Sequence, residues 1–325
     1  MLNSKVLVFC LCAFLMGGLT LAAQEALLSG PVSGSVYDPA SRSLRPIVGL
    51  PGASYLGDPL IADLDWAAAA PDGRTMLALR SGRLWAVRQT GSALLWAGID
   101  GGLASPERAA WSADGSAAAI YSSRQGLQLL RSLGDTPAAG PAVELAGRVT
   151  ALAVEASGAC AVAGVEAERD GGIYLVCADA APKLLVGLAH PAALALAPNN
   201  NDALFVADRG SGQILEVRNF RGEAAVMPFA ADASGSWDPV GAAVSGDGAF
   251  LYVAHRSAKR VDAYEVASRT LASRIAIEWE PTLLEPLAVK SVFLLKSPGG
   301  RGEPLLVLEA GRELAVYFVP SGRGQ

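Results

Sequence analysis

The sequence predicts an all-β fold, a β-propeller built from four-stranded blades. One observation is a phrase that recurs along the chain: an apolar strand followed by a turn of the form Ala/Ser-x-Asp/Asn-Gly/Asn. A second is the spacing of this phrase, about 42–48 residues, which is the period of a propeller blade. The phrase reads WAAAAPDG (66–73), AAWSADG (109–115), LAVEASG (152–158), LALAPNN (194–200), AAVSGDG (242–248) and, more loosely, LAVKSVFLLKSPGG (287–300).

The segments that follow each phrase supply the other strands of a blade. A second strand, a tight turn and a third strand come next, as in MLALRSGRLWAVR (76–88), and a fourth strand such as LLWAG (94–98) closes the unit. These short runs are rich in Val, Leu, Ala and Tyr and are bounded by Gly, Asp and Asn, which leaves little room for helices. The Ala-rich first strands fit the innermost position, because small side chains let converging backbones approach.

The two ends of the chain predict how the ring closes. YEVASRTL (264–271) joins the third and fourth strands of its unit, and YDPASRSL (37–44) is expected to do the same at the N-terminus. The last unit supplies a first strand (288–295), a second (304–309) and a third (313–319), but no fourth. The ends therefore predict one shared blade, in which N- and C-terminal strands pair and remove exposed sheet edges. Six blades with an extra strand at the seam is the preferred count, and seven blades with one thin blade is the alternative.

The N-terminus predicts the compartment. Residues 1–23 have one Lys, a long apolar stretch and the small residues Ala22 and Ala23 before Gln24, which is the pattern of a secretory signal peptide. An uncleaved membrane anchor is the alternative, because the apolar run approaches the length of a membrane span. We expect a secreted or periplasmic protein, with residues 24–325 forming a single propeller domain and no membrane span after cleavage.

Composition excludes two classes of protein. Hydrophobic residues make up 51% of the 325 residues and charged residues 18%, which argues against disorder. Lys and Arg total 26 against 31 Asp and Glu, so no nucleic-acid-binding surface is expected.

Two of the four cysteines, Cys10 and Cys12, leave with the signal peptide. Cys160 and Cys177 remain, on the second and third strands of one blade and on either side of a hairpin. Opposite positions in an antiparallel pair suit a disulfide, and an oxidising compartment permits one. Two unpaired buried thiols are the alternative.

One position just before each first strand predicts a candidate site. First strands of all blades begin at the same mouth of the central channel, so the residues at this position point toward a shared space, where a ligand is expected. His190 with the carboxylates Asp63, Asp238 and Glu285 could bind a divalent cation. The alternative is that polar residues simply occupy exposed loops. The position holds Asp63, Ser105, Arg148, His190, Asp238 and Glu285.

A second recurring position holds arginine, at the turn between second and third strands. Its repetition predicts a structural role, such as pairing with a carboxylate or bonding to turn carbonyls. The residues are Arg80, Arg124, Arg209, Arg256 and Arg312.

Several blades resemble known repeats. LFVADRGSGQILEVR (204–218) and FLYVAHRSAKRVDAYEV (250–266) resemble the repeats of NHL-type and YVTN-type propellers, the latter including lactonase-like proteins. WSADGSAAAIYSSRQGLQLLR (111–131) resembles TolB-type repeats. The resemblance spans nearly the whole mature chain, one blade at a time, and implies a propeller of the broad WD40-like superfamily. HPAALALAPNN (190–200) departs from the metal-dependent sugar lactonases by placing Ala where they have an Asn ligand.

The functional prediction is therefore a binding or interaction protein that engages a protein partner or a polar small molecule at its loop faces or channel mouth. No catalytic residue is identified. The alternative is a metal-dependent, lactonase-like hydrolase in which the mouth ring holds a cation that activates water. A structural component of the cell envelope is a third hypothesis, because a fold by itself does not fix a function.

Overall fold

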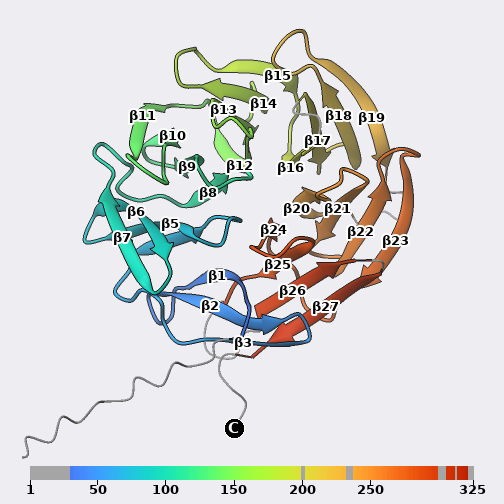
Figure 1. The fold of residues 1–325 in the computed structure, drawn as a ribbon. Coiled ribbons are helices and arrows are strands. Elements are labelled where there is room, and N and C mark those ends of the chain that lie inside the picture. The colour runs from blue at the N-terminus through green and yellow to red at the C-terminus, as the bar shows by residue number, and fades with distance from the viewer. Residues whose placement is uncertain (1–29, 199–201, 232–236, 299–304, 312, 321–325) are drawn as a thin grey trace, which may run out of the picture.

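The computed structural model describes residues 30–198, 202–231, 237–298, 305–311 and 313–320. Seven antiparallel sheets stand around a central axis as the blades of a propeller (Figure 1). Six of these sheets have four strands and one has three. The described residues contain strands and turns but no helix, and none of them forms a helix that could cross a membrane. The predicted all-β propeller is confirmed.

The blades follow one another along the chain. In each blade the first strand is the innermost, and the later strands follow in order away from the axis. Blade 1 contains β1 (Val32–Asp38), β2 (Ser43–Leu50) and β3 (Ala53–Leu56). Blade 2 contains β4 (Trp66–Ala69), β5 (Thr75–Arg80), β6 (Arg83–Thr90) and β7 (Ala93–Gly98). Blade 3 contains β8 (Arg108–Trp111), β9 (Ala118–Ser122), β10 (Gly126–Arg131) and β11 (Ala138–Val143). Blade 4 contains β12 (Arg148–Val154), β13 (Cys160–Glu166), β14 (Gly172–Cys177) and β15 (Lys183–Gly187).

The remaining three blades have four strands each. Blade 5 contains β16 (Pro191–Leu196), β17 (Ala203–Asp208), β18 (Gln213–Arg218) and β19 (Ala225–Ala231). Blade 6 contains β20 (Pro239–Val244), β21 (Phe250–His255), β22 (Arg260–Glu265) and β23 (Thr270–Ala276). Blade 7 contains β24 (Glu285–Pro286), β25 (Val292–Lys296), β26 (Leu305–Ala310) and β27 (Leu314–Val319).

Small residues allow the innermost strands to approach each other. Gly241 on β20 shows how close the approach is, because a Cβ placed there would lie 2.3 Å from the backbone N of Leu284, at the start of blade 7. No side chain fits in that space without moving backbone. The Ala- and Gly-rich first strands of the sequence therefore have the steric role that was predicted for them.

The hydrophobic core lies between adjacent blades. Between blades 5 and 6, the buried rings of Phe205, Phe229 and Tyr264 stack edge to face, with centroids 4.9 Å apart for the first pair and 6.4 Å for the second. Similar clusters join the other blades. Packing of the sheets face to face holds the ring together, because the side chains of each strand point alternately into the two neighbouring interfaces.

The preferred count of six blades is wrong, and the seven-bladed alternative with one thin blade is correct. YDPASRSL does not connect a third and a fourth strand: it joins β1 to β2, the two innermost strands of the three-stranded blade 1. YEVASRTL joins β22 to β23, the third and fourth strands of blade 6. In both copies the arginine has positive φ, 49° at Arg42 and 59° at Arg269. The shared octapeptide thus specifies a hairpin turn, whatever the position of that hairpin in its blade.

The first and last blades meet at the seam of the ring as two separate sheets. The predicted sharing of one blade is wrong because the last unit already has four strands. The segment expected as its first strand, 288–295, contains most of β25, the second strand, and the two-residue β24 ahead of it is the first. Blades 1 and 7 instead pack side by side around one hydrophobic cluster. Three backbone hydrogen bonds between described residues cross the seam: from Leu56 N to Pro320 O (2.8 Å), and from the N–H groups of Ala288 (3.0 Å) and Val289 (3.4 Å) to Ser33 O.

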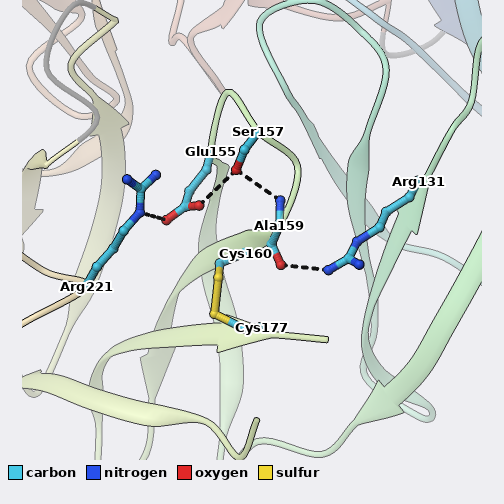
Figure 2. Close-up of a disulfide and its surroundings, with 7 residues drawn as sticks. All are labelled: Arg131, Glu155, Ser157, Ala159, Cys160, Cys177 and Arg221. Carbon is cyan, nitrogen blue, oxygen red and sulfur yellow. Dashed lines mark hydrogen bonds and ion pairs between the residues drawn. A yellow bond between two sulfur atoms is a disulfide. The ribbon is translucent and has the colours of Figure 1, made fainter. Parts of the chain in front are cut away.

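Cys160 and Cys177 form a disulfide with an S–S distance of 2.03 Å, which confirms the bridged alternative (Figure 2). They are directly opposite each other in the β13–β14 pair, as their predicted strand positions require. The neighbouring turn is tied to the blades on either side. Arg131 of blade 3 donates to the carbonyl of Ala159 (2.9 Å), and Arg221 of blade 5 pairs with the buried carboxylate of Glu155 (2.8 Å).

Candidate functional site at the channel mouth

All six predicted mouth residues lie at the starts of innermost strands, on one face of the ring. Arg148 and Glu285 are the first residues of β12 and β24, and His190 and Asp238 directly precede β16 and β20. Asp63 and Ser105 lie a little further ahead of β4 and β8. Five of the side chains are exposed and Asp238 is half-buried. The six residues therefore lie on one face of the ring. Their hydrogen bonds and ion pairs show which of them are connected to each other.

Glu166 connects two of the predicted residues. It is the last residue of β13, opposite Arg148 in the strand register, and its carboxylate accepts a hydrogen bond from the Arg148 guanidinium. The other carboxylate oxygen lies 2.8 Å from Nδ1 of His190, in blade 5. The hydrogen bond from Arg148, followed by that from His190, holds the pKa of Glu166 below its usual value. A cation, an anion and a histidine are thus fixed in a row across blades 4 and 5.

Asp238 forms a second link, between blades 5 and 6. Its carboxylate lies 3.0 Å from Nε of Arg209 and accepts a hydrogen bond from Ser257 Oγ (2.8 Å). Beside it, Trp237 donates its indole N–H to the backbone oxygen of Asp208 (2.7 Å). Arg209 therefore has the carboxylate-pairing role predicted for the recurring arginines, and the same holds for Arg80, which lies 3.6 Å from Asp63. Arg312 lies outside the described residues.

A buried carboxylate lies between these two links. Asp208 ends β17 with only 3% of its surface exposed. One oxygen accepts the backbone N–H of Ser211 (2.8 Å), and the other is buried without a hydrogen-bond partner among the described residues. Gly210 lies between this carboxylate and His190: a Cβ there would lie 3.2 Å from His190 Cδ2 and 3.5 Å from Asp208 Oδ2. An acceptor left unpaired in this way is costly and unusual in a structural position.

We call the linked residues of blades 4 to 6 the mouth sector. The name covers the two links and the buried carboxylate of Asp208, all on this face. It comprises Arg148, Glu166, His190, Asp208, Arg209 and Asp238.

The other three predicted residues stand apart from the mouth sector. Asp63 pairs with Arg80, and Ser105 Oγ lies 3.4 Å from Ser122 Oγ. Glu285 is exposed at the start of β24, but the protein atoms around its carboxyl group desolvate it and raise its pKa. The positive charge of Arg108 on blade 3 partly offsets that effect.

The predicted metal ligands Asp63, His190, Asp238 and Glu285 are not gathered into one cluster. Within the described residues, no group of three or more His, Cys, Asp or Glu side chains is placed to hold a metal ion. The strongest association of His190 is with a carboxylate that an arginine already neutralises.

Sequence reasoning did not place Glu166 or Asp208 at the candidate site. Both occupy one repeated position, the last residue of a blade's second strand, which the antiparallel register sets beside the start of the first strand. Aligning the repeats on that position as well as on the first strand would have brought Glu166 next to Arg148 and Asp208 next to Pro191.

No family model matches the chain, and no curated protein matches it. Solved structures with the same fold are numerous. A putative 6-phosphogluconolactonase from Bacteroides fragilis NCTC 9343 is 12% identical, with a TM-score of 0.63, covering 89% of this chain and 95% of that one. A periplasmic gluconolactonase from Pseudomonas aeruginosa is 16% identical, with a TM-score of 0.60, covering 89% and 96%. A functionally unknown protein from Desulfotomaculum acetoxidans DSM 771 is 13% identical, with a TM-score of 0.62, covering 90% and 100%. At these identities the likeness is one of fold.

Proposed function

We propose that this protein is an extracytoplasmic binding protein that takes a polar ligand, either a small molecule or a polar segment of a partner protein, at the mouth sector. The observation that carries the proposal is the row formed by Arg148, Glu166 and His190, which ion pairs and hydrogen bonds fix across two blades. Such a row presents donors and acceptors in set positions, so little ordering is needed when a ligand binds.

Two observations support the extracytoplasmic location. One is the predicted signal peptide at residues 1–23, which lies outside the described residues. The other is the Cys160–Cys177 disulfide, because structural disulfides persist mainly in oxidising compartments.

The test is a ligand screen by thermal unfolding of the mature chain, from Gln24, against polar metabolites and short polar peptides. A ligand at about 100 times its Kd stabilises the folded state by about 2.7 kcal/mol, enough to shift the unfolding midpoint by several degrees. We expect the shift to disappear in His190→Ala and Glu166→Gln and to persist in Asp179→Asn, an exposed control in the turn between β14 and β15. Shifts that survive both mouth substitutions would place binding elsewhere and contradict the proposal.

A metal-dependent lactonase-like hydrolase is the second candidate, and the two lactonase structures of the same fold are what favour it. Its test is the unfolding midpoint in EDTA and after addition of Ca²⁺, Zn²⁺ or Mn²⁺. A rise of several degrees with one ion, absent in His190→Ala and Asp238→Ala, would favour the hydrolase. An unchanged midpoint would remove the metal from consideration.

A further inference from the structure

An open hollow of about 540 Å³ lies on blade 2, away from the mouth sector, and is lined by Arg80, Ser81, Arg83, Trp85 and Trp96. We infer that this hollow binds an organic carboxylate that carries a ring able to stack on an indole, such as a uronate sugar or an aromatic acid. The inference is independent of the proposed function, because none of the lining residues belongs to the mouth sector.

The backbone places two arginines side by side. Arg80 ends β5 and Arg83 begins β6, and they are directly opposite each other in the strand register. The turn between them has positive φ at both positions, 51° at Ser81 and 74° at Gly82, which is the two-residue turn that matches the strand twist. Like charges directly opposite in a sheet are destabilising. An anion bound between the two guanidinium groups would relieve this repulsion. The tight turn, which fixes both groups next to the hollow, therefore suits the recognition of an anion.

Arg83 is held in a defined orientation. Its guanidinium carbon lies 4.7 Å from the centroid of the Trp85 ring, within the range of a cation–π interaction. It also lies over Gly98 of β7, where an added Cβ would come within 2.5 Å of its terminal nitrogen. The absence of a side chain at Gly98 thus lets the guanidinium lie flat between the two strands.

Trp96 supplies an exposed aromatic surface. It packs edge to face on Trp85, with centroids 6.0 Å apart and an interplanar angle of 79°, and 37% of its surface is open to solvent. By contrast Phe229, also on an outermost strand, is 5% exposed because its ring is covered by the next blade. An indole left open beside two arginines is available for stacking against a ligand ring.

The three-stranded blade 1 explains why this face is open. Trp85 packs at its inner side on a cluster that includes Leu44 and Leu64, from blade 1 and the segment that follows it. The outermost strand of blade 1, β3, has only four residues, and no fourth strand follows it. The outer part of blade 2 is therefore left without the cover that a full neighbouring blade would give.

The charges in the hollow are held by partners that a ligand can replace. Arg80 lies 3.6 Å from Asp63 and Arg83 lies 3.1 Å from Asp100, and the two carboxylate side chains are 84% and 95% exposed. Ion pairs this open to water are weak, whereas a guanidinium can bind a ligand carboxylate through two parallel hydrogen bonds. The hollow also has the size of a typical small-ligand site, which holds a ligand of one or two rings.

The experiment is isothermal titration calorimetry on the mature chain with two carboxylates, digalacturonate and indole-3-acetate. Each is paired with a neutral counterpart, the corresponding neutral disaccharide and indole-3-acetamide. We expect at least one carboxylate to bind about tenfold or more tightly than its neutral counterpart, since each hydrogen bond to a charged group contributes a factor of that order. Which carboxylate binds better identifies the source of the ligand, a saccharide or an aromatic acid.

Three variants locate the binding. Trp96→Ala removes the stacking surface, Arg83→Gln removes the charge, and Gly98→Ala displaces the guanidinium while keeping it in the protein. We expect each to weaken binding about tenfold or more. Two controls remove the same groups elsewhere: Arg88→Gln, on the opposite face of β6, and Trp279→Ala, whose side chain is 48% exposed ahead of blade 7. Both should bind as the wild type does.

The unfolding midpoints of all five variants establish that each is folded. If Trp96→Ala disturbs blade 2, Gly98→Ala still tests the site, because it keeps Trp96 and Arg83 in the protein. Failure of both carboxylates to bind the folded wild type would overturn the inference. So would equal binding of the neutral counterparts, or binding that survives in the three hollow variants. His190→Ala should leave this binding unchanged, which separates the result from that of the mouth sector.

Discussion

Removing the Cys160–Cys177 disulfide should lower the free energy of unfolding of the propeller, because the unfolded chain regains the conformational entropy that the bridge removes. The bridge closes a loop with a sequence separation of 17 residues. The loss of loop-closure entropy in the unfolded chain for such a loop is worth about 3 kcal/mol at 25 °C. Both cysteines are only partly buried, so replacing them with serine adds little cavity cost.

The expected change in midpoint follows from the size of the domain. A domain of about 300 residues unfolds with an entropy of about 0.6 kcal/mol per kelvin, so the loss corresponds to about 5 °C. The measurement is thermal unfolding by circular dichroism of the wild type and of the double variant Cys160→Ser/Cys177→Ser, each with and without dithiothreitol. The reductant should lower the unfolding midpoint of the wild type to that of the double variant, and it should leave the midpoint of the double variant unchanged.

Two results would refute this reasoning. A double variant within about 1 °C of the wild type would mean that the ties from Arg131 and Arg221 already restrict the β13–β14 hairpin, so that the covalent bridge adds nothing. A further loss in the double variant on adding dithiothreitol would mean that the reductant acts on something other than this bond. A thiol assay on native protein adds a check on location, since material from an oxidising compartment should contain no free thiol in the mature chain.

Three further predictions concern single residues, each measured by thermal unfolding. Glu166→Gln should cost about 1–2 kcal/mol at neutral pH, because it removes the shared partner of an ion pair with Arg148 and a hydrogen bond with His190. The pKa of Glu166 in the folded state lies below the ordinary 4.5, so the loss of stability should be full above pH 4.5 and vanish as the pH falls through the folded-state pKa. A difference in stability between wild type and variant that persists in acid would contradict this prediction. Glu285→Gln should raise the midpoint at pH 8 and not at pH 4, because its raised pKa makes the charged form the unfavourable one; no gain at pH 8 would refute this. Gly241→Ala should destabilise by about 1–3 kcal/mol, because its Cβ meets backbone 2.3 Å away, whereas Gly246→Ala, with nothing within 4 Å, should have little effect.

Local patterns in the sequence predicted the blade and its hydrogen-bonded pairs well. The register of Cys160 with Cys177 followed from counting residues on either side of one hairpin, and the pairing of Arg209 with a carboxylate followed from its repetition. Such features depend on residues near each other in the chain, where turn chemistry and strand alternation are decisive.

The count of blades and the partners at the mouth depended on contacts that no local pattern records. YDPASRSL encodes a hairpin turn, and that turn is equally compatible with an inner or an outer pair of strands. The first strand of blade 7 is only two residues long, β24 (Glu285–Pro286), too short to be recognised by alternation. Glu166 and His190 come from different blades, so only the packing of those blades brings them within hydrogen-bonding distance.

The seam between blades 1 and 7 has a mechanical consequence. At every other junction a covalent link carries the chain from one blade to the next, whereas here the described blades are joined by packing and by backbone hydrogen bonds such as Leu56 N to Pro320 O. A force applied to the two ends of the molecule therefore acts first on the seam. The ring should open there, while the blades stay folded and remain linked through the chain. Because each blade is one continuous stretch of sequence, a blade could also be gained or lost at this point without dividing any sheet. The seam is thus where a ring of this kind can change its number of blades in evolution.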